Sequence, residues 1–198
     1  MTFLRLIRVK QWIKNLFVFL PLIFGGKLLS SQGVTESIAV FACFCLGSSA
    51  IYVLNDIIDR KADRLHPVKC HRPVASGLMS ARSAAYISAF LAAASIAGSI
   101  FLFPGNAAVC VITVTYLLLN VLYSCALKHM AIIDVMVIAL GFVLRVFAGG
   151  EACGIPVSPW LTIMVFMLTL FIAFGKRRDD LLRMKAVSYT HLTLPTIA

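Results

Sequence analysis

The residues best suited to chemistry lie in a short polar stretch, residues 55–67, which holds three of the chain's eight acidic residues. Asp56, Asp59 and Asp63 are spaced i, i+3 and i+7, so a helix would place their side chains on one face. Three like charges on one stripe repel each other unless a cation lies among them. The alternative is a solvated helix end whose acids pair with Arg60, Lys61 and Arg64.

An asparagine and two basic residues extend this pattern. Asn55, Asp56 and Asp59 offer the hard oxygen ligands that suit Mg²⁺, an ion that usually bridges one or two carboxylates to substrate phosphates. Lys69 and Arg72 follow in the same segment, and the arginine fork fits bidentate contact with phosphate. The combination predicts a site that binds a metal and a diphosphate and activates the diphosphate as a leaving group.

Composition indicates what must position these residues. The chain is 61% hydrophobic with a mean hydropathy of +0.95, far above the apolar share of roughly 45–50% in soluble domains. The net charge of +10 is spread over loops that flank apolar runs, so nucleic acid is not an expected partner. An integral protein of the lipid bilayer is expected.

Six apolar runs have the length of a membrane span. They predict an all-α, polytopic transmembrane helical bundle. In the first run, Pro21 and the pair Gly25-Gly26 predict a kink or an end. The runs cover about residues 12–29, 35–54, 83–103, 106–126, 130–148 and 159–175.

Orientation follows from the basic residues, which favour the cytoplasmic side. With a cytoplasmic N-terminus, all of the 18 Lys and Arg residues except Lys27 and Arg145 fall on that side. Residues 1–11 then form a basic amphipathic lead at an anionic membrane surface. We therefore expect a multi-pass protein of the cell inner (plasma) membrane, with the N-terminus and the acidic stretch in the cytoplasm.

Two ionisable residues lie within the fifth run. Asp134 and Arg145 are candidate functional residues, because charges inside membrane spans are costly and usually serve a purpose. The alternatives are that Asp134 caps or anchors its helix and that Arg145 extends toward the far interface.

The last twelve residues have a different character. Val187–Ala198 is neither apolar enough for a span nor a continuation of the charged segment before it, and it resembles the translation of a sequencing-adapter end. We expect residues 1–186 to be one membrane domain, incomplete at its C-terminus, and residues 187–198 to be a non-native tail.

The acidic stretch resembles a known motif. Asn55-Asp56-x-x-Asp59-x-x-x-Asp63 is similar to the first aspartate-rich motif of the UbiA superfamily of intramembrane prenyltransferases. The continuation through 66–77, with Lys69 and Arg72, looks like the decaprenyl-phosphate phosphoribosyltransferase branch.

Three further segments match that branch. They are Lys10–Asn15, Tyr123–Lys128, and Lys176-Arg177 followed by Asp180. Val9 replaces the proline expected before the first segment, and Asp180 stands where the branch more often has glutamate.

The resemblance implies about nine membrane helices, of which about six are present, and two acidic motifs that face each other over a cytoplasmic cavity. It implies Mg²⁺ as cofactor and transfer of 5-phosphoribose from its 1-diphosphate to a polyprenyl (decaprenyl) phosphate. We assign catalysis to Asp56, Asp59 and Asp63, and Mg²⁺ binding to Asp56 and Asp59 with Asn55 and Asp63 as secondary ligands. The substrate-binding candidates are Asn55, Lys69, Arg72, Lys14, Asn15, Tyr123, Lys128, Arg145, Lys176, Arg177 and Asp180.

Two other functions stay open. In another branch of the superfamily the lipid carries the diphosphate, and an aromatic acceptor such as 4-hydroxybenzoate or a quinone precursor takes the prenyl group. A cation-coupled transporter would instead place acids deep within spans and show internal repeats, neither of which the sequence displays. Whether the chain forms a homo-oligomer stays open.

Overall fold

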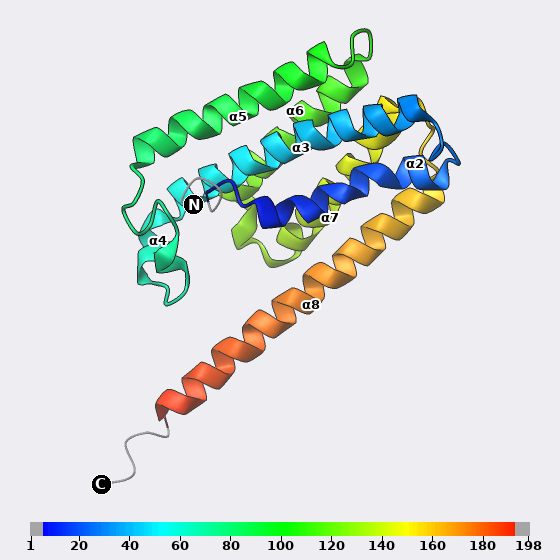
Figure 1. The fold of residues 1–198 in the computed structure, drawn as a ribbon. Helices are drawn as coiled ribbons and strands as arrows, with labels where there is room; N and C mark the ends of the chain where they lie inside the picture. The colour runs from blue at the N-terminus through cyan, green and yellow to red at the C-terminus, as the bar shows by residue number, and fades with distance from the viewer. Residues whose placement is uncertain (1–5, 193–198) are drawn as a thin grey trace.

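The computed structural model describes residues 6–192, and the side chains of all of these except 129, 131, 180, 181 and 183–192. Every element in this described range is a helix, so the predicted all-α class is confirmed. Figure 1 shows long helices lying side by side, with α8 running away from the others toward the C-terminus.

The first predicted span is built differently from the others. It consists of a 3₁₀-helix, η1 (Val9–Phe19), followed directly by a short α-helix, α2 (Leu20–Phe24). Because a 3₁₀-helix rises about 2.0 Å per residue and an α-helix about 1.5 Å, the two cover about 29 Å, close to the roughly 30 Å of a bilayer core. The predicted end is also observed, since Gly25 caps α2 and Gly26 has a positive φ of 69°.

Five longer helices follow. Two of them start at serine caps, where Ser30 Oγ accepts from Gly33 N–H at 3.2 Å and Ser80 Oγ accepts from Ser83 N–H at 3.0 Å, which pairs an otherwise free helix donor. The helices are α3 (Ser31–Ile58), α5 (Ala81–Phe101), α6 (Ala107–Cys125), α7 (Ala131–Ala152) and α8 (Pro159–Leu192).

Three short helices lie in the connections. They are α4 (Arg60–Leu65) and η2 (Lys69–His71) between α3 and α5, and η3 (Leu127–His129) between α6 and α7.

α3 is the central helix of the bundle. It packs against α5, η1, α6 and α7, while α8 packs mainly against α7. The main core cluster joins Val18 of η1, Phe44 of α3, Tyr116 of α6 and Ala148 of α7. The Phe44 and Tyr116 rings lie 5.0 Å apart between centroids, so aromatic contacts bind α3 to α6.

Five of the described helices are long and apolar enough to cross a membrane, namely α3, α5, α6, α7 and α8. The prediction of six spans therefore holds for five single helices, and the remaining one is the two-part segment η1–α2. Large apolar side chains such as Phe90, Phe101 and Phe171 are exposed on the outer faces. An apolar exterior of this extent is expected where lipid, not water, surrounds the helices. The protein is an integral membrane protein.

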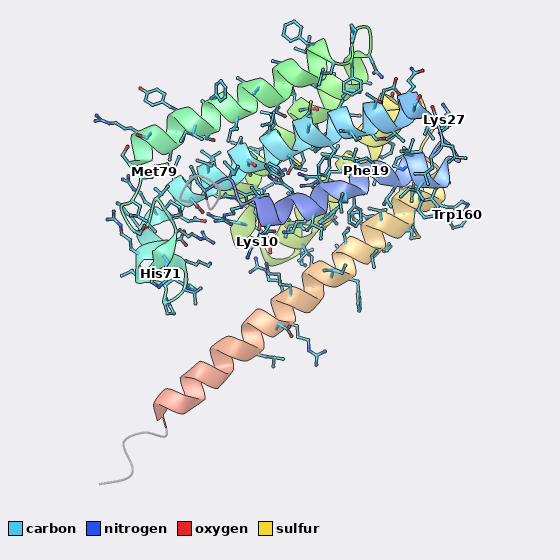
Figure 2. The ribbon with its side chains drawn as sticks, in the orientation of Figure 1. Lys10, Phe19, Lys27, His71, Met79 and Trp160 are labelled. Carbon is cyan, nitrogen blue, oxygen red and sulfur yellow. The ribbon has the colours of Figure 1, made fainter. Side chains whose placement is uncertain are left out.

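The two ends of the bundle differ in character. In Figure 2, Lys27 and Trp160 lie at one end of the bundle, and His71 and Met79 lie at the other. The second end carries the C-terminus of α3, α4, η2 and the loop that leads to α5. The acidic stretch is therefore at an end of the bundle, where water and lipid meet.

Candidate active site

The helix predicted through all three aspartates is interrupted at Asp59. α3 ends at Ile58, and Asp59, with φ −84° and ψ 0°, links it to α4. The interruption is small, because the Asp59 N–H still donates to Asn55 O at 2.9 Å. Its effect is that the three carboxylates do not share one partner: Asp56 and Asp63 meet the same arginine, and Asp59 meets a lysine on another loop.

Arg72 joins two buried carboxylates. Its Nη1 donates to Asp63 Oδ2 at 2.7 Å and lies 3.3 Å from Asp56 Oδ1. Asp56 is 1% exposed and Asp63 is 3% exposed. Carboxylates at such depth need a cation, since an unpaired buried charge is strongly unfavourable. Arg72, which the sequence analysis assigned to phosphate binding, thus contacts two acids of the motif directly.

Arg8 is a second cation on Asp56. Its Nη2 forms an ion pair with Asp56 Oδ1, and its guanidinium lies 5.2 Å from the centre of the Tyr52 ring. Both arginines approach the same oxygen of Asp56. The other oxygen, Oδ2, is buried and has no hydrogen-bond partner among the described residues. The sequence placed Arg8 in a membrane-surface segment and did not link it to the site, because the two residues are 48 positions apart.

The loop that carries Arg72 and Lys69 is held from several sides. Arg64 Nε donates to Ala75 O at 3.1 Å, and Val74 packs in a cluster with Leu6 and Val53. His66 Nδ1 accepts from the main-chain N–H groups of residues 68 and 69 at 3.2 and 3.3 Å. His66 therefore serves as a structural cap of this loop. Lys69, in the same loop, is exposed.

Asp59 is paired across the loops. Lys128, in η3, donates to Asp59 Oδ1 at 2.5 Å, and both side chains are partly exposed. This contact brings the α6–α7 loop to the end of α3. Two segments that the motif resemblance selected separately, one around Asp59 and one around Lys128, are thus adjacent.

A third buried carboxylate lies beside this pair. Asp134 is fully buried, and its Oδ1 accepts from Tyr123 Oη at 2.7 Å. Its Oδ2 accepts from Arg177 Nε at 2.6 Å, and Arg177 Nη2 also contacts this oxygen. Asp134 therefore connects α6, α7 and α8, and it holds two of the predicted substrate-binding side chains.

Asn15 and Arg145, two further candidates, meet inside the bundle. Arg145 Nε donates to Asn15 Oδ1 at 2.8 Å, and both residues are buried. Arg145 does not extend to the far interface, which was the alternative suggested by its sequence position. Lys14 lies within electrostatic range of Arg145, Arg8 and Lys176, so basic residues from three helices gather along η1.

The remaining candidates divide by position. Asn55 is half-buried in the last turn of α3, next to Asp56, and Lys176 is exposed on α8. The side chain of Asp180 lies outside the described residues. Residues that the sequence analysis missed are Arg8 and Tyr116, and Asp134 was left undecided. No local pattern marks an arginine or tyrosine whose partner lies on a distant helix.

The donor set fits Mg²⁺ bound together with a phosphate ligand. Oδ2 of Asp56, which is buried and has no partner among the described residues, can serve as a metal ligand. Asp59 and Asn55, which are partly exposed, carry further oxygens in the same segment. In the described part of the chain no three His, Cys, Asp or Glu side chains are grouped closely enough to form a metal cage. Mg²⁺ does not need one, since it commonly takes one or two carboxylates, waters and substrate phosphates.

Relatives with described functions match along most of the chain. The chain is 40% identical over 181 residues to a decaprenyl-phosphate phosphoribosyltransferase of Corynebacterium glutamicum, which covers 90% of this chain and 54% of the relative. A protein of the same name from Mycolicibacterium smegmatis is 36% identical over 182 residues, covering 90% of this chain and 56% of the relative. The chain thus spans about half the length of these relatives.

Solved structures show the same fold. A UbiA homolog from Archaeoglobus fulgidus, solved with DMAPP and Mg²⁺, superposes with a TM-score of 0.73 at 22% identity, over 86% of this chain and 60% of that one. The profile of the UbiA prenyltransferase family matches residues 18–190. Together with the aspartate motif at one end of a membrane helix bundle, this match shows that the chain belongs to the UbiA prenyltransferase family.

Proposed function

We propose that the protein is a Mg²⁺-dependent membrane transferase that moves 5-phosphoribose from phosphoribosyl diphosphate to a polyprenyl (decaprenyl) phosphate, with release of diphosphate. The observation that supports this most is the group formed by Asp56, Asp63, Arg8 and Arg72. In it, one buried carboxylate oxygen has no partner within the described part of the chain. The names of two relatives at 40% and 36% identity support the choice of substrates.

Asp56 and Asp59 are the proposed metal ligands, with Asn55 and Asp63 as secondary ligands or orienting residues. When bound, Mg²⁺ neutralises the charge that develops on the departing diphosphate oxygens. Asp63 is already held by Arg72 at 2.7 Å, which makes it suited to keep Arg72 in place. Asp56 has one oxygen on the arginines and the other unpaired, which makes it the better first ligand.

Arg72, Lys69 and Lys128 are the proposed phosphate contacts, and Arg8 joins them because of its place on Asp56. A guanidinium carries five N–H donors, so each arginine can bind a carboxylate and still donate to a phosphate oxygen. Asp134 orients Tyr123 and Arg177 by hydrogen bonds. Tyr123 is near enough to Asp59 to feel its charge. These residues would bind the diphosphate in one orientation, which is the main contribution that a protein makes to such a transfer.

The acceptor needs no general base in this proposal. A polyprenyl phosphate is already an anion, so its oxygen can attack the anomeric carbon as soon as the two substrates are aligned. The C–O bond to the diphosphate breaks as the new C–O bond forms, and the electron pair leaves with the diphosphate. The lipid chain would lie along the apolar helix faces and pass into the bilayer, for which the exposed apolar side chains of the outer helices are suited.

We place the protein in the plasma membrane with the acidic end of the bundle on the cytoplasmic side, because the positively charged loops gather at that end. Single cysteines in place of Lys61 and Lys27 test the orientation, since Lys61 lies in α4 beside the acidic residues and Lys27 lies at the opposite end. A thiol reagent that cannot cross membranes should label the second variant in intact cells and the first only after lysis. The reverse pattern would overturn the orientation.

The activity is tested with membranes that contain the protein, labelled phosphoribosyl diphosphate and polyprenyl phosphate. A lipid-soluble labelled product is expected, and it should disappear in Asp56→Asn but persist in Lys61→Gln, which alters an exposed residue of the same segment. Offering polyprenyl diphosphate with an aromatic acceptor in parallel separates the prenyltransferase alternative. Product only from that pair, or ion flux with no product, would overturn the proposal.

A further inference from the structure

Arg145 is a buried cation whose observed hydrogen-bond partners are neutral. Its guanidinium donates to Asn15 Oδ1 at 2.8 Å, to Gly141 O at 2.7 Å and to Tyr116 Oη at 2.8 Å. It also lies over the rings of Tyr116 and Phe142, at 4.7 and 5.1 Å from their centres. A charge inside a membrane bundle is costly and persists where it serves a purpose. Each of the three nitrogens of Arg145 donates a hydrogen bond within the protein, and the residue is 6% exposed, so Arg145 holds other helices in place.

Asn15, in η1, joins Arg145 to α3. Its amide nitrogen donates to Ser48 Oγ at 3.1 Å and lies 3.3 Å from Cys45 Sγ, while its oxygen accepts from Arg145. Tyr116 of α6, Arg145 of α7, Asn15 of η1 and Ser48 of α3 therefore form one continuous chain of buried hydrogen bonds. We call these four residues the Arg145 relay.

η1 needs such a contact. A 3₁₀-helix has poorer hydrogen-bond geometry than an α-helix and seldom runs beyond three or four residues, yet η1 covers 11. Tertiary contacts hold it on both sides: Trp12 Nε1 donates to Ser49 Oγ at 3.0 Å, and Gly149 of α7 leaves room for the main-chain carbonyl of Val18.

The N-terminal end of η1 determines where Arg8 lies. Arg8 precedes η1 in the left-handed conformation, with φ 51° and ψ 52°, which residues other than glycine rarely adopt unless the surroundings impose it. The carbonyl of Ile7, one residue earlier, accepts from Ser49 Oγ at 3.0 Å. A shift of η1 would therefore move the Arg8 guanidinium away from Asp56.

We propose that Arg145 is a positioning residue, which acts with Asn15 and Tyr116 to fix η1 and so hold Arg8 against Asp56. It acts through η1, not by touching a substrate. The effect on metal binding rests on the proposed function, whereas the position of η1 does not.

The position of η1 can be measured directly by the distance between two spin labels. Labels at Lys10→Cys and Lys61→Cys report on η1 and α4, both being exposed sites. Cys70, Cys110 and Cys125 are replaced by serine, because they are at least partly exposed and would also take up the label. The other three cysteines are buried and are kept. In lipid nanodiscs we expect one narrow distance distribution, broadened or shifted by Arg145→Lys and, to a smaller extent, by Tyr116→Phe.

Ser95→Ala is the matched control. It removes a buried hydrogen bond to the Cys43 carbonyl, at 2.8 Å, that joins α5 to α3 away from η1, and it should leave the distribution unchanged. An unchanged distribution in both Arg145→Lys and Tyr116→Phe would overturn the proposal. A change of the same size in Ser95→Ala would overturn it as well, since the effect would then be a general loosening of the bundle.

The link to Arg8 is tested with Mn²⁺, an EPR-visible probe, in a double-mutant cycle. Arg8→Gln removes a cation that competes for Asp56, so Mn²⁺ should bind about three- to tenfold more tightly, a coupling usual for groups in direct contact. Arg145→Lys should shift the affinity in the same direction, and the double variant should add nothing further. Additive shifts would overturn the link.

The two measurements separate the inference from the proposed function. If Mn²⁺ binds to none of the variants, the metal assignment fails, and the spin-label distances alone decide whether Arg145 positions η1.

Discussion

The Arg72 guanidinium lies between two buried carboxylates, with Nη1 2.7 Å from Asp63 Oδ2 and 3.3 Å from Asp56 Oδ1. The two aspartates belong to different helices, α4 and α3, so this arginine ties the acidic loop to the bundle. In the proposed function, the same arrangement of carboxylates and arginine would bind a metal and a diphosphate together.

Replacement of Arg72 by glutamine should destabilise the acidic end of the bundle. Breaking a buried ion pair typically costs about 3–5 kcal/mol, but the Arg72 side chain is 25% exposed, so we expect about 2 kcal/mol. Thermal unfolding in detergent measures the loss. Lys61→Gln removes the same charge from an exposed site of α4 and should have little effect; equal shifts in the two variants would contradict the buried pairing.

Asp56→Asn should weaken Mn²⁺ binding by at least about tenfold, because a divalent ion loses a charged oxygen ligand. Titration followed by EPR measures the affinity without any need for turnover. Glu151→Gln is the control, since Glu151 is exposed at the end of α7 far from Asp56. Equal affinity in Asp56→Asn and the wild-type protein would remove Asp56 from the metal site.

Gly149→Ala should displace η1. A Cβ at this position would overlap the main-chain carbonyl of Val18, which cannot move as a flexible side chain can. Overpacking of this kind costs about 1–3 kcal/mol or more. Gly175→Ala is the matched control on α8, where a Cβ meets nothing within 4 Å, and it should be neutral or gain up to about 1 kcal/mol of helix propensity. A stable, unshifted Gly149→Ala variant would show that η1 is not held this closely.

Tyr123→Phe and Asp134→Asn should be strongly coupled. Tyr123→Phe deletes the donor of the 2.7 Å hydrogen bond to Asp134, at a cost of about 1–2 kcal/mol. Asp134→Asn also removes the charge that faces Arg177, so it should cost more. In a double-mutant cycle read by thermal unfolding, the two effects should fall short of additivity by about 1 kcal/mol; full additivity would mean that the two side chains do not interact.

Much of the architecture is a local property of the sequence and was predicted from it. A run of about twenty apolar residues can bury its main-chain polar groups in a bilayer only as a helix, so α3, α5, α6, α7 and α8 follow from composition alone. The helix cap at Gly25 and the placement of the aspartates at the end of a span follow in the same way, since both depend on neighbouring residues.

What only the tertiary structure decided is which charges meet. Arg8 and Asp56 are 48 positions apart, Lys128 and Asp59 are 69 apart, and Arg145 and Asn15 are 130 apart; no spacing rule extends over such distances. Likewise, η1 packs against α3 and α7, and no local pattern in its own residues predicted a 3₁₀-helix. Propensity acts within a turn or two of helix, whereas an ion pair in the interior of the bundle depends on how separate helices pack.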